Sequence, residues 1–110
     1  GRNCDEVVDM TLEELFEIID SRAQADPTAS WTAKLLAKGP EKCAQKFGEE
    51  AVEAIIEAIK DDKTKLVSEA ADVLFHLLVM LKSRDVTLKD VMEELAKRQG
   101  QSGLQEKTSR

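Results

Sequence analysis

Apolar residues recur at intervals of three and four through most of the chain, which is the spacing of one face of an α-helix. Strand-forming residues never alternate convincingly with polar ones, and only two prolines and five glycines interrupt the pattern. Together, these features predict an all-α fold without a β-sheet.

Capping and stop signals divide this pattern into five predicted helices. The first opens with the capping box Thr11-x-x-Glu14 and is stopped by Asp26-Pro27. The other four are predicted over residues 31–38, 40 to about 60, 64–83 and 87 to about 100. A short polar turn joins the third helix to the fourth, so we expect an antiparallel helical bundle. We predict one helical domain over residues 11–100, between a disordered or extended segment (1–10) and a mobile polar tail (101–110).

Charged side chains gather on one face of the third predicted helix. At about 100° per residue, this face holds Lys42, Lys46, Glu50, Glu53 and Glu57, with Glu49 at its edge. The remaining positions are mostly apolar, and the apolar stripe is too wide for an ordinary surface helix. We therefore expect this helix to be covered on more than one side.

The fourth predicted helix is the most apolar part of the chain. Its polar side chains between residues 66 and 81 are Ser68, Glu69, Asp72 and His76, and the last three share a face. A helix that is apolar nearly all round is usually buried, and an unpaired buried carboxylate costs several kcal/mol. Either a basic side chain from elsewhere or a bound cation must offset that cost.

The spacing of the acidic residues favours the cation. Glu50 with Glu53, and Glu69 with Asp72, form two pairs, each one helical turn apart, and the short turn folds the pairs together. Four carboxylates suit Mg²⁺, whereas zinc would need His and Cys ligands. A second ion could arrive with the substrate. For Glu50 and Glu53 taken alone, an ordinary solvated acidic face remains an equal alternative.

Several other residues are ambiguous from sequence. Lys42 and Lys46 are either surface lysines or phosphate contacts, since they precede Glu50 by two turns and one turn. His76 is expected to be a core or outer-layer hydrogen-bonding residue rather than a metal ligand. For Trp31, packing in the core or at a partner interface is favoured over base stacking.

Composition narrows the choice of partners. The chain has 16 basic and 22 acidic residues, a net charge of −6, which argues against nucleic acid. No apolar run approaches the roughly 20 residues needed to cross a membrane. The two cysteines have neither metal-site nor disulfide spacing, so we expect a cytoplasmic protein. A chain of 110 residues buries little surface alone, and the wide apolar faces predict a homodimer or higher homo-oligomer.

Two groups of motifs resemble known families. Glu49-Glu50-Ala51-Val52-Glu53 and, after fifteen residues, Glu69-Ala70-Ala71-Asp72 resemble the E-E-x-x-E…E-x-x-D motif of the all-α nucleotide pyrophosphohydrolases, which include MazG-like enzymes and dimeric dUTPases. Residues 30–39, 42–50 and 101–107 are similar, more narrowly, to the phosphoribosyl-ATP pyrophosphohydrolase family of histidine biosynthesis. The resemblance covers the chain from about Thr11 to its C-terminus.

The resemblance implies a MazG-like bundle completed by homodimerisation, with the site near the subunit boundary. It also implies Mg²⁺-dependent hydrolysis of 1-(5-phosphoribosyl)-ATP to 1-(5-phosphoribosyl)-AMP and pyrophosphate, the second step of histidine biosynthesis. We expect the tail to close over the bound polyphosphate. The expected metal ligands are Glu50, Glu53, Glu69 and Asp72; Glu49 is the expected base or water-orienting group, and the expected phosphate contacts are Lys38, Lys42, Lys46 and Lys107.

Three alternatives compete with this interpretation. A related pyrophosphohydrolase acting on a noncanonical dNTP would share the acidic site. A carboxylate-bridged redox bundle would need Glu-x-x-His pairs, but the only histidine stands seven residues after Glu69. A non-enzymatic helical oligomerisation module would show no effect of divalent metal on its melting temperature.

Overall fold

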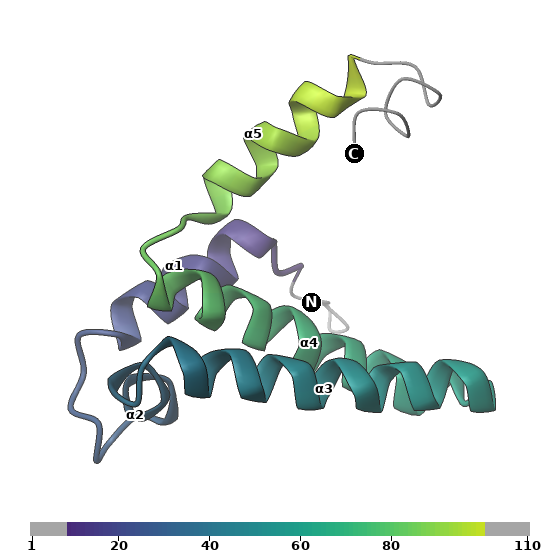
Figure 1. Ribbon diagram of the computed structural model, residues 1–110, viewed down its shortest axis with the longest axis horizontal. Coiled ribbons are helices and arrows are strands. Elements are labelled where there is room, and N and C mark those ends of the chain that lie inside the picture. The colour runs from purple at the N-terminus through teal and green to yellow at the C-terminus, as the bar shows by residue number, and fades with distance from the viewer. Residues whose placement is uncertain (1–8, 101–110) are drawn as a thin grey trace.

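The computed structural model describes residues 9–100, which form five α-helices and no β-strand (Figure 1). The helices are α1 (Leu12–Arg22), α2 (Trp31–Ala37), α3 (Pro40–Lys60), α4 (Lys63–Ser83) and α5 (Leu88–Gln99). The all-α prediction is confirmed over this part of the chain, and the predicted helix boundaries are close to those observed. None of these helices combines the length and apolar character needed to cross a membrane.

Local hydrogen bonds explain where the helices begin. In the predicted capping box of α1, the Thr11 amide donates to Glu14 Oε1 (2.9 Å) and the Glu14 amide donates to Thr11 Oγ1 (3.1 Å). Helix α4 begins one residue earlier than predicted because Asp62 caps it, accepting a hydrogen bond from the Lys65 amide (3.1 Å). Asp61 adopts a left-handed conformation (φ 60°), which ends α3 and allows the chain to reverse.

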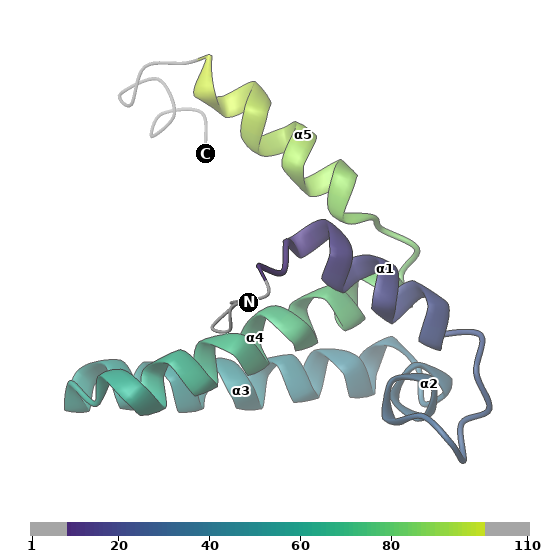
Figure 2. The same cartoon turned by 180° about the vertical axis from the view of Figure 1, so that it is seen from behind.

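Helices α3 and α4 form a long antiparallel hairpin, as expected (Figure 1). Figure 2 shows α1 lying across the half of α4 that is remote from the turn, while α2 packs near the start of α3. Helix α5 leaves the same end of the hairpin and contacts α1, and its later turns extend away from the other helices (Figure 1). The short helices therefore cover only one end of the hairpin.

The buried side chains gather at this covered end, where all five helices contribute to one core cluster. Its members are Ile19, Leu35, Cys43, Leu78, Val79 and Leu88. The Cys43 thiol donates to the Leu35 carbonyl oxygen at 3.5 Å, and an ion pair between Lys82 Nζ and Asp20 Oδ1 (2.6 Å) joins α4 to α1. The core cluster thus fixes the end of the hairpin that is remote from its turn.

Large apolar side chains remain exposed on the rest of the hairpin. Ile59 is 80% exposed and Val67 is 71% exposed, on either side of the Asp61–Asp62 turn. We call the whole set the open face: Val52, Ile55, Ile56, Ile59, Val67 and Leu74. Within the single chain this part of α3 is not covered on more than one side, because α1, α2 and α5 do not reach it. The three short helices leave apolar faces of both long helices exposed, as their width led us to expect.

Candidate metal centre

Three carboxylates meet near the middle of the hairpin. One oxygen from each of Glu50, Glu69 and Asp72 lies within 4.8 Å of the other two. Glu50 comes from the middle of α3, whereas Glu69 and Asp72 are one turn apart on α4. Among residues 9–100, this is the only group of three or more acidic, histidine or cysteine side chains close enough to share a metal ion. The predicted meeting of the two acidic pairs is therefore largely observed.

The environment of Glu69 favours a cation. Its Oε1 atom is buried and has no hydrogen-bond partner among the described residues. Burial raises the pKa of Glu69, and the adjoining carboxyl group of Glu53 and the negative charges of Asp72 and Glu50 raise it further. A cation bound among these groups would offset the free-energy cost of burying the Glu69 carboxylate and the repulsion between the neighbouring carboxylates. Carboxylate oxygens are the ligands that Mg²⁺ prefers, so the residues present fit that ion.

Glu53 and Glu57 continue the acidic face of α3. The carboxyl group of Glu53 is close enough to Glu69 to affect its pKa, but it lies outside the 4.8 Å group. Glu57 is largely buried, and its Oε1 atom has no hydrogen-bond partner in the described structure although Lys60 Nζ lies at 3.9 Å. The four-residue spacing from Glu53 predicts Glu57 on this face, although nothing in the sequence assigns it a role.

Glu49 points to a different set of partners. Gln45 Nε2 donates to Glu49 Oε2 (2.9 Å), and Lys46 Nζ lies 3.3 Å from Glu49 Oε1. The hydrogen bonds from Gln45 and Lys46 are the main causes that lower the pKa of Glu49. In this arrangement Glu49 is an ionised, exposed carboxylate beside the three-carboxylate group rather than within it.

The predicted phosphate contacts lie at different distances along the chain from the carboxylates. Lys42 and Lys46 are half-buried on α3, two turns and one turn before Glu49 and Glu50, whereas Lys38 is exposed at the C-terminal cap of α2. Lys107, like the rest of the predicted tail, lies outside the described residues. Lys46 therefore has the most direct path to an anion bound at the carboxylates.

His76 is buried on α4, four residues after Asp72, and is not part of the carboxylate group. Its ring packs edge-on against Phe75, with centroids 5.1 Å apart and an interplanar angle of 85°. Burial lowers the pKa of His76, which favours the neutral imidazole, while the charges of Glu50 and Asp72 oppose this shift. The buried position agrees with the prediction of a core residue, but the Nδ1 atom of His76 has no hydrogen-bond partner in the described structure, so the predicted hydrogen bond is not observed.

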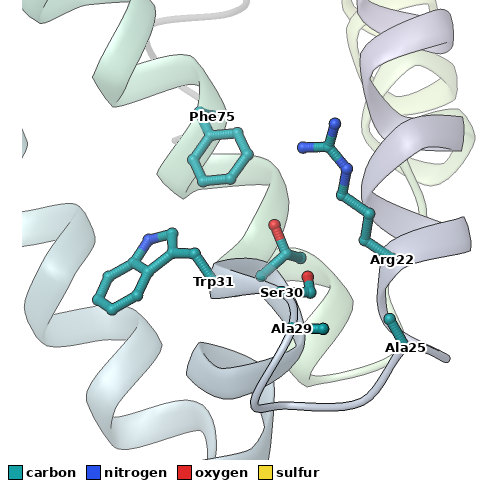
Figure 3. A pocket seen from close by; sticks show the side chains of 7 residues that line it. Arg22, Ala25, Ala29, Ser30, Trp31 and Phe75 are labelled. Carbon is teal, nitrogen blue, oxygen red and sulfur yellow. The ribbon is translucent and has the colours of Figure 1, made fainter.

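A pocket that sequence reasoning missed lies between α1, α2 and α4 (Figure 3). Its volume is about 460 Å³, within the range of roughly 300–1,000 Å³ that is typical of small-molecule sites. Trp31 is 51% exposed and lines this pocket, so it does not pack in the core of the single chain; the alternative of a partner interface stays a prediction. The three-residue spacing from Asp72 to Phe75 was a usable signal, but nothing in the sequence pointed to Arg22. The lining residues are Arg22, Ala25, Ala29, Ser30, Trp31, Thr32 and Phe75.

The arrangement combines acidic oxygen ligands, nearby lysines and an adjoining pocket. Clustered carboxylates can hold a divalent cation, and such a cation can neutralise the oxygens of a phosphoanhydride. A redox bundle would require histidine ligands, and the single histidine is not in the cluster. The site therefore fits hydrolysis of a phosphorylated substrate better than redox chemistry.

Comparison with known proteins leads to the same family. Residues 12–99 match the family model described as phosphoribosyl-ATP pyrophosphohydrolase. Over 99 residues, 90% of this chain, it is 70% identical to a phosphoribosyl-ATP pyrophosphatase of Paracoccus denitrificans, of which the match covers 92%. The corresponding protein of Ruegeria pomeroyi is 69% identical over the same share of this chain and 94% of its own length. The chain belongs to the phosphoribosyl-ATP pyrophosphohydrolase family.

Proposed function

We propose that this protein hydrolyses 1-(5-phosphoribosyl)-ATP to 1-(5-phosphoribosyl)-AMP and pyrophosphate, the second step of histidine biosynthesis. The observation that carries the proposal is the group formed by Glu50, Glu69 and Asp72 in a chain of this family. The substrate presents a triphosphate, whose oxygens need positive charge around them as the α–β bond breaks.

Mg²⁺ is the proposed cofactor, with Glu50, Glu69 and Asp72 as its ligands. Glu53 is the proposed fourth ligand, since its carboxyl group adjoins Glu69 on the same side of the hairpin. When bound, the ion would neutralise phosphate oxygens and lower the pKa of a bound water. The buried Oε1 atom of Glu69 supports this proposal, because it is an acceptor without a hydrogen-bond donor in the described structure.

The chain's own residues would orient the substrate and the attacking water. Lys42 and Lys46 can bind phosphate oxygens from the α3 side of the site, and Lys38 and Lys107 are proposed as further phosphate contacts. Glu49 is exposed and has a lowered pKa, which favours an orienting role through hydrogen bonding over proton abstraction as a strong base. Its present partners, Gln45 and Lys46, hold it beside the site.

We propose that a second copy of the chain covers the open face. Val52, Ile55, Ile56 and Ile59 follow helical spacing on α3, and Val67 and Leu74 are separated by two turns on α4. So many exposed large apolar side chains on two neighbouring helices of a small chain are typical of a protein–protein interface. The resulting homodimer would join the two hairpins in one bundle, with the carboxylates near the subunit boundary.

A substrate panel tests the proposed activity. The full-length chain is incubated with phosphoribosyl-ATP, ATP and several noncanonical dNTPs, with Mg²⁺ or with EDTA, and pyrophosphate release is measured. We expect release from phosphoribosyl-ATP only when Mg²⁺ is present, with 1-(5-phosphoribosyl)-AMP as the other product. Faster release from a dNTP would favour the related nucleotide-clearing activity, and no release from any substrate would contradict enzymatic function.

Sedimentation velocity tests the proposed dimer. The wild-type chain should sediment as a dimer or a higher oligomer, and Ile56→Lys should dissociate it by placing a charge in the interface. Lys89→Ile provides a control on exposed α5, where Lys89 pairs only loosely with Glu93 at 3.8 Å. A monomeric wild type would contradict the proposal.

A further inference from the structure

The proposed substrate differs from ATP in one chemical feature. It carries a second ribose 5-phosphate on N1 of the adenine ring, so an enzyme that acts on it must distinguish this group to avoid hydrolysing ATP. The carboxylates and lysines described above recognise phosphates and divalent metal, which ATP also offers. Selectivity therefore requires a separate place that recognises the ribose 5-phosphate on N1.

The pocket between α1, α2 and α4 has the chemistry of such a place. Trp31 and Phe75 supply aromatic surface, and aromatic rings are common platforms for nucleobases. Arg22 supplies a guanidinium group, which matches the geometry of a phosphate monoester. In Figure 3, the guanidinium group of Arg22 extends into the space across from Phe75, and Trp31 lies on the same side as Phe75.

The position of the pocket also suits one extended substrate. Phe75 follows Asp72 by three residues on α4, so the two side chains are neighbours on one helix face. The pocket consequently begins about one helical turn from the carboxylate group. Arg22, at the last position of α1, lies on the far side of the pocket from α4 (Figure 3). A ligand with phosphates at both ends could thus reach from the carboxylates to Arg22.

We propose, on the basis of the proposed function, that this pocket binds the part of the substrate beyond the triphosphate. Trp31 and Phe75 contact the adenine ring, and Arg22 binds the 5-phosphate of the ribose attached to N1. Arg22 is then a specificity-determining residue, because ATP has no group that reaches it.

A neighbouring pocket contains Lys34, a second basic residue that could bind the ribose 5-phosphate instead of Arg22. It shares Ala29, Ser30 and Trp31 with the first pocket and includes Lys34 in place of Arg22. Phe75 does not line it, so the neighbouring pocket lacks the direct connection along α4 to Asp72. We therefore favour Arg22, and the Lys34→Met variant tests the other assignment.

Trp31 provides an intrinsic reporter for the first test, because the chain has one tryptophan and no tyrosine. Emission is recorded while AMP, phosphoribosyl-AMP or inorganic pyrophosphate is added with Mg²⁺, and absorption by the ligand is corrected with free tryptophan amide. Both nucleotides should change the emission, whereas pyrophosphate should not. Unchanged emission at saturating phosphoribosyl-AMP would overturn the proposal.

The second test compares affinities by calorimetry. Wild type should bind phosphoribosyl-AMP more tightly than AMP. Arg22→Met should lower the affinity for phosphoribosyl-AMP by about 10- to 100-fold while leaving the affinity for AMP unchanged. Arg98→Met on α5 is the matched control and should behave as wild type. The assignment of Arg22 would be overturned if Arg22→Met still preferred phosphoribosyl-AMP over AMP as wild type does. It would also be overturned if Lys34→Met lost this preference.

The two proposals fail in different ways. If wild type releases no pyrophosphate from phosphoribosyl-ATP, the proposed function is wrong. If wild type releases it and Arg22→Met retains the preference for phosphoribosyl-AMP over AMP, the function stands and the role of Arg22 is wrong. Circular dichroism of each variant checks that the helices are intact.

Discussion

The core cluster and the open face lie on the same hairpin but have opposite surroundings. Leu78 is fully buried by residues from the other helices, whereas Leu74, one turn earlier on α4, is 42% exposed. Both positions are leucines in the most apolar segment of the chain, and their sequence context differs little. The difference arises because α1 and α2 reach only the end of the hairpin that is remote from its turn.

This comparison shows what an apolar pattern means for a helix. The pattern identifies surface that is costly to leave in water, but it does not identify what covers that surface. At the core cluster, the cover comes from the same chain. At the open face, we propose that it comes from a second copy. On α4, the carboxylates Glu69 and Asp72 lie between the open-face residues Val67 and Leu74.

The largest expected effect is on the free energy of unfolding, and it tests the difference between the core cluster and the open face directly. Leu78→Ala should lower the free energy of unfolding by about 2–5 kcal/mol, because it leaves a cavity in the core cluster. Leu74→Ala should cost only about 0.5 kcal/mol at protein concentrations below the dimer dissociation constant, as an exposed position would.

Above that concentration, the cost of Leu74→Ala should approach that of Leu78→Ala, because association couples to folding. Urea unfolding at a low and a high protein concentration measures both variants. A small, concentration-independent cost at Leu74 would show that no second copy covers the open face there.

The next effect is on activity, at the carboxylates that lie among the open-face positions of the hairpin. Asp72→Asn should lower kcat by about 100- to 1,000-fold, since it removes a negative oxygen from the proposed metal site with little change in volume. We expect a comparable loss from Glu53→Gln, because a cation beside Glu69 would attract the adjoining carboxylate. Pyrophosphate release measures both.

Asp85→Asn is the matched control for Asp72→Asn. Asp85 is exposed just beyond α4 with a left-handed backbone (φ 59°), a conformation that asparagine also tolerates. Its turnover should equal that of wild type. Wild-type turnover in Asp72→Asn, with helices intact, would contradict the proposed site.

Mg²⁺ should stabilise the folded protein through the same carboxylates. At a concentration 100 times its dissociation constant, the ion should add about 2.7 kcal/mol to the free energy of unfolding. Mg²⁺ should stabilise the Glu69→Gln variant less than wild type, because this substitution removes one proposed ligand of the ion. Melting curves with and without Mg²⁺ measure this, and equal shifts in wild type and variant would place the ion elsewhere.

The smallest expected effect compares two helix caps. Thr11→Ala removes the cap of α1, whose Ile19 is in the core cluster. It should lower the free energy of unfolding by about 1 kcal/mol. Asp62→Ala removes the cap of α4, where the first three helical residues are all exposed, and should cost less because this turn can fray locally. Urea unfolding compares the two, and equal costs would mean that the hairpin turn unfolds together with the core.

Local signals were sufficient to predict most of the helices and the central part of the site. The capping box at Thr11 and the caps Ser30 and Thr87 depend on side chains within three residues of the helix start. Glu50 and Glu69 could be placed together because the turn between their helices is short, which leaves one antiparallel arrangement. Each of these features depends on residues that are close in sequence or joined by a tight turn.

Other features depended on packing between distant segments. Trp31 is the only tryptophan, for which a core position or a partner interface was favoured, yet α2 turns it toward the pocket beside Phe75. Arg22 is brought there by the angle at which α1 crosses the hairpin. Glu49 could not be separated from its neighbour Glu50 by sequence spacing, and only the side-chain partners Gln45 and Lys46 distinguish it.

The sequence by itself determined the helices, the turn between α3 and α4, and which faces of those helices are apolar or acidic, because helical periodicity and capping act over a few residues. Only the tertiary structure decided which apolar face the chain covers, which carboxylates come within 4.8 Å, and that Arg22, Trp31 and Phe75 line one pocket. These outcomes depend on how far the short helices reach along the hairpin and on the angle at which they cross it, and several crossing angles are compatible with one pattern of apolar residues.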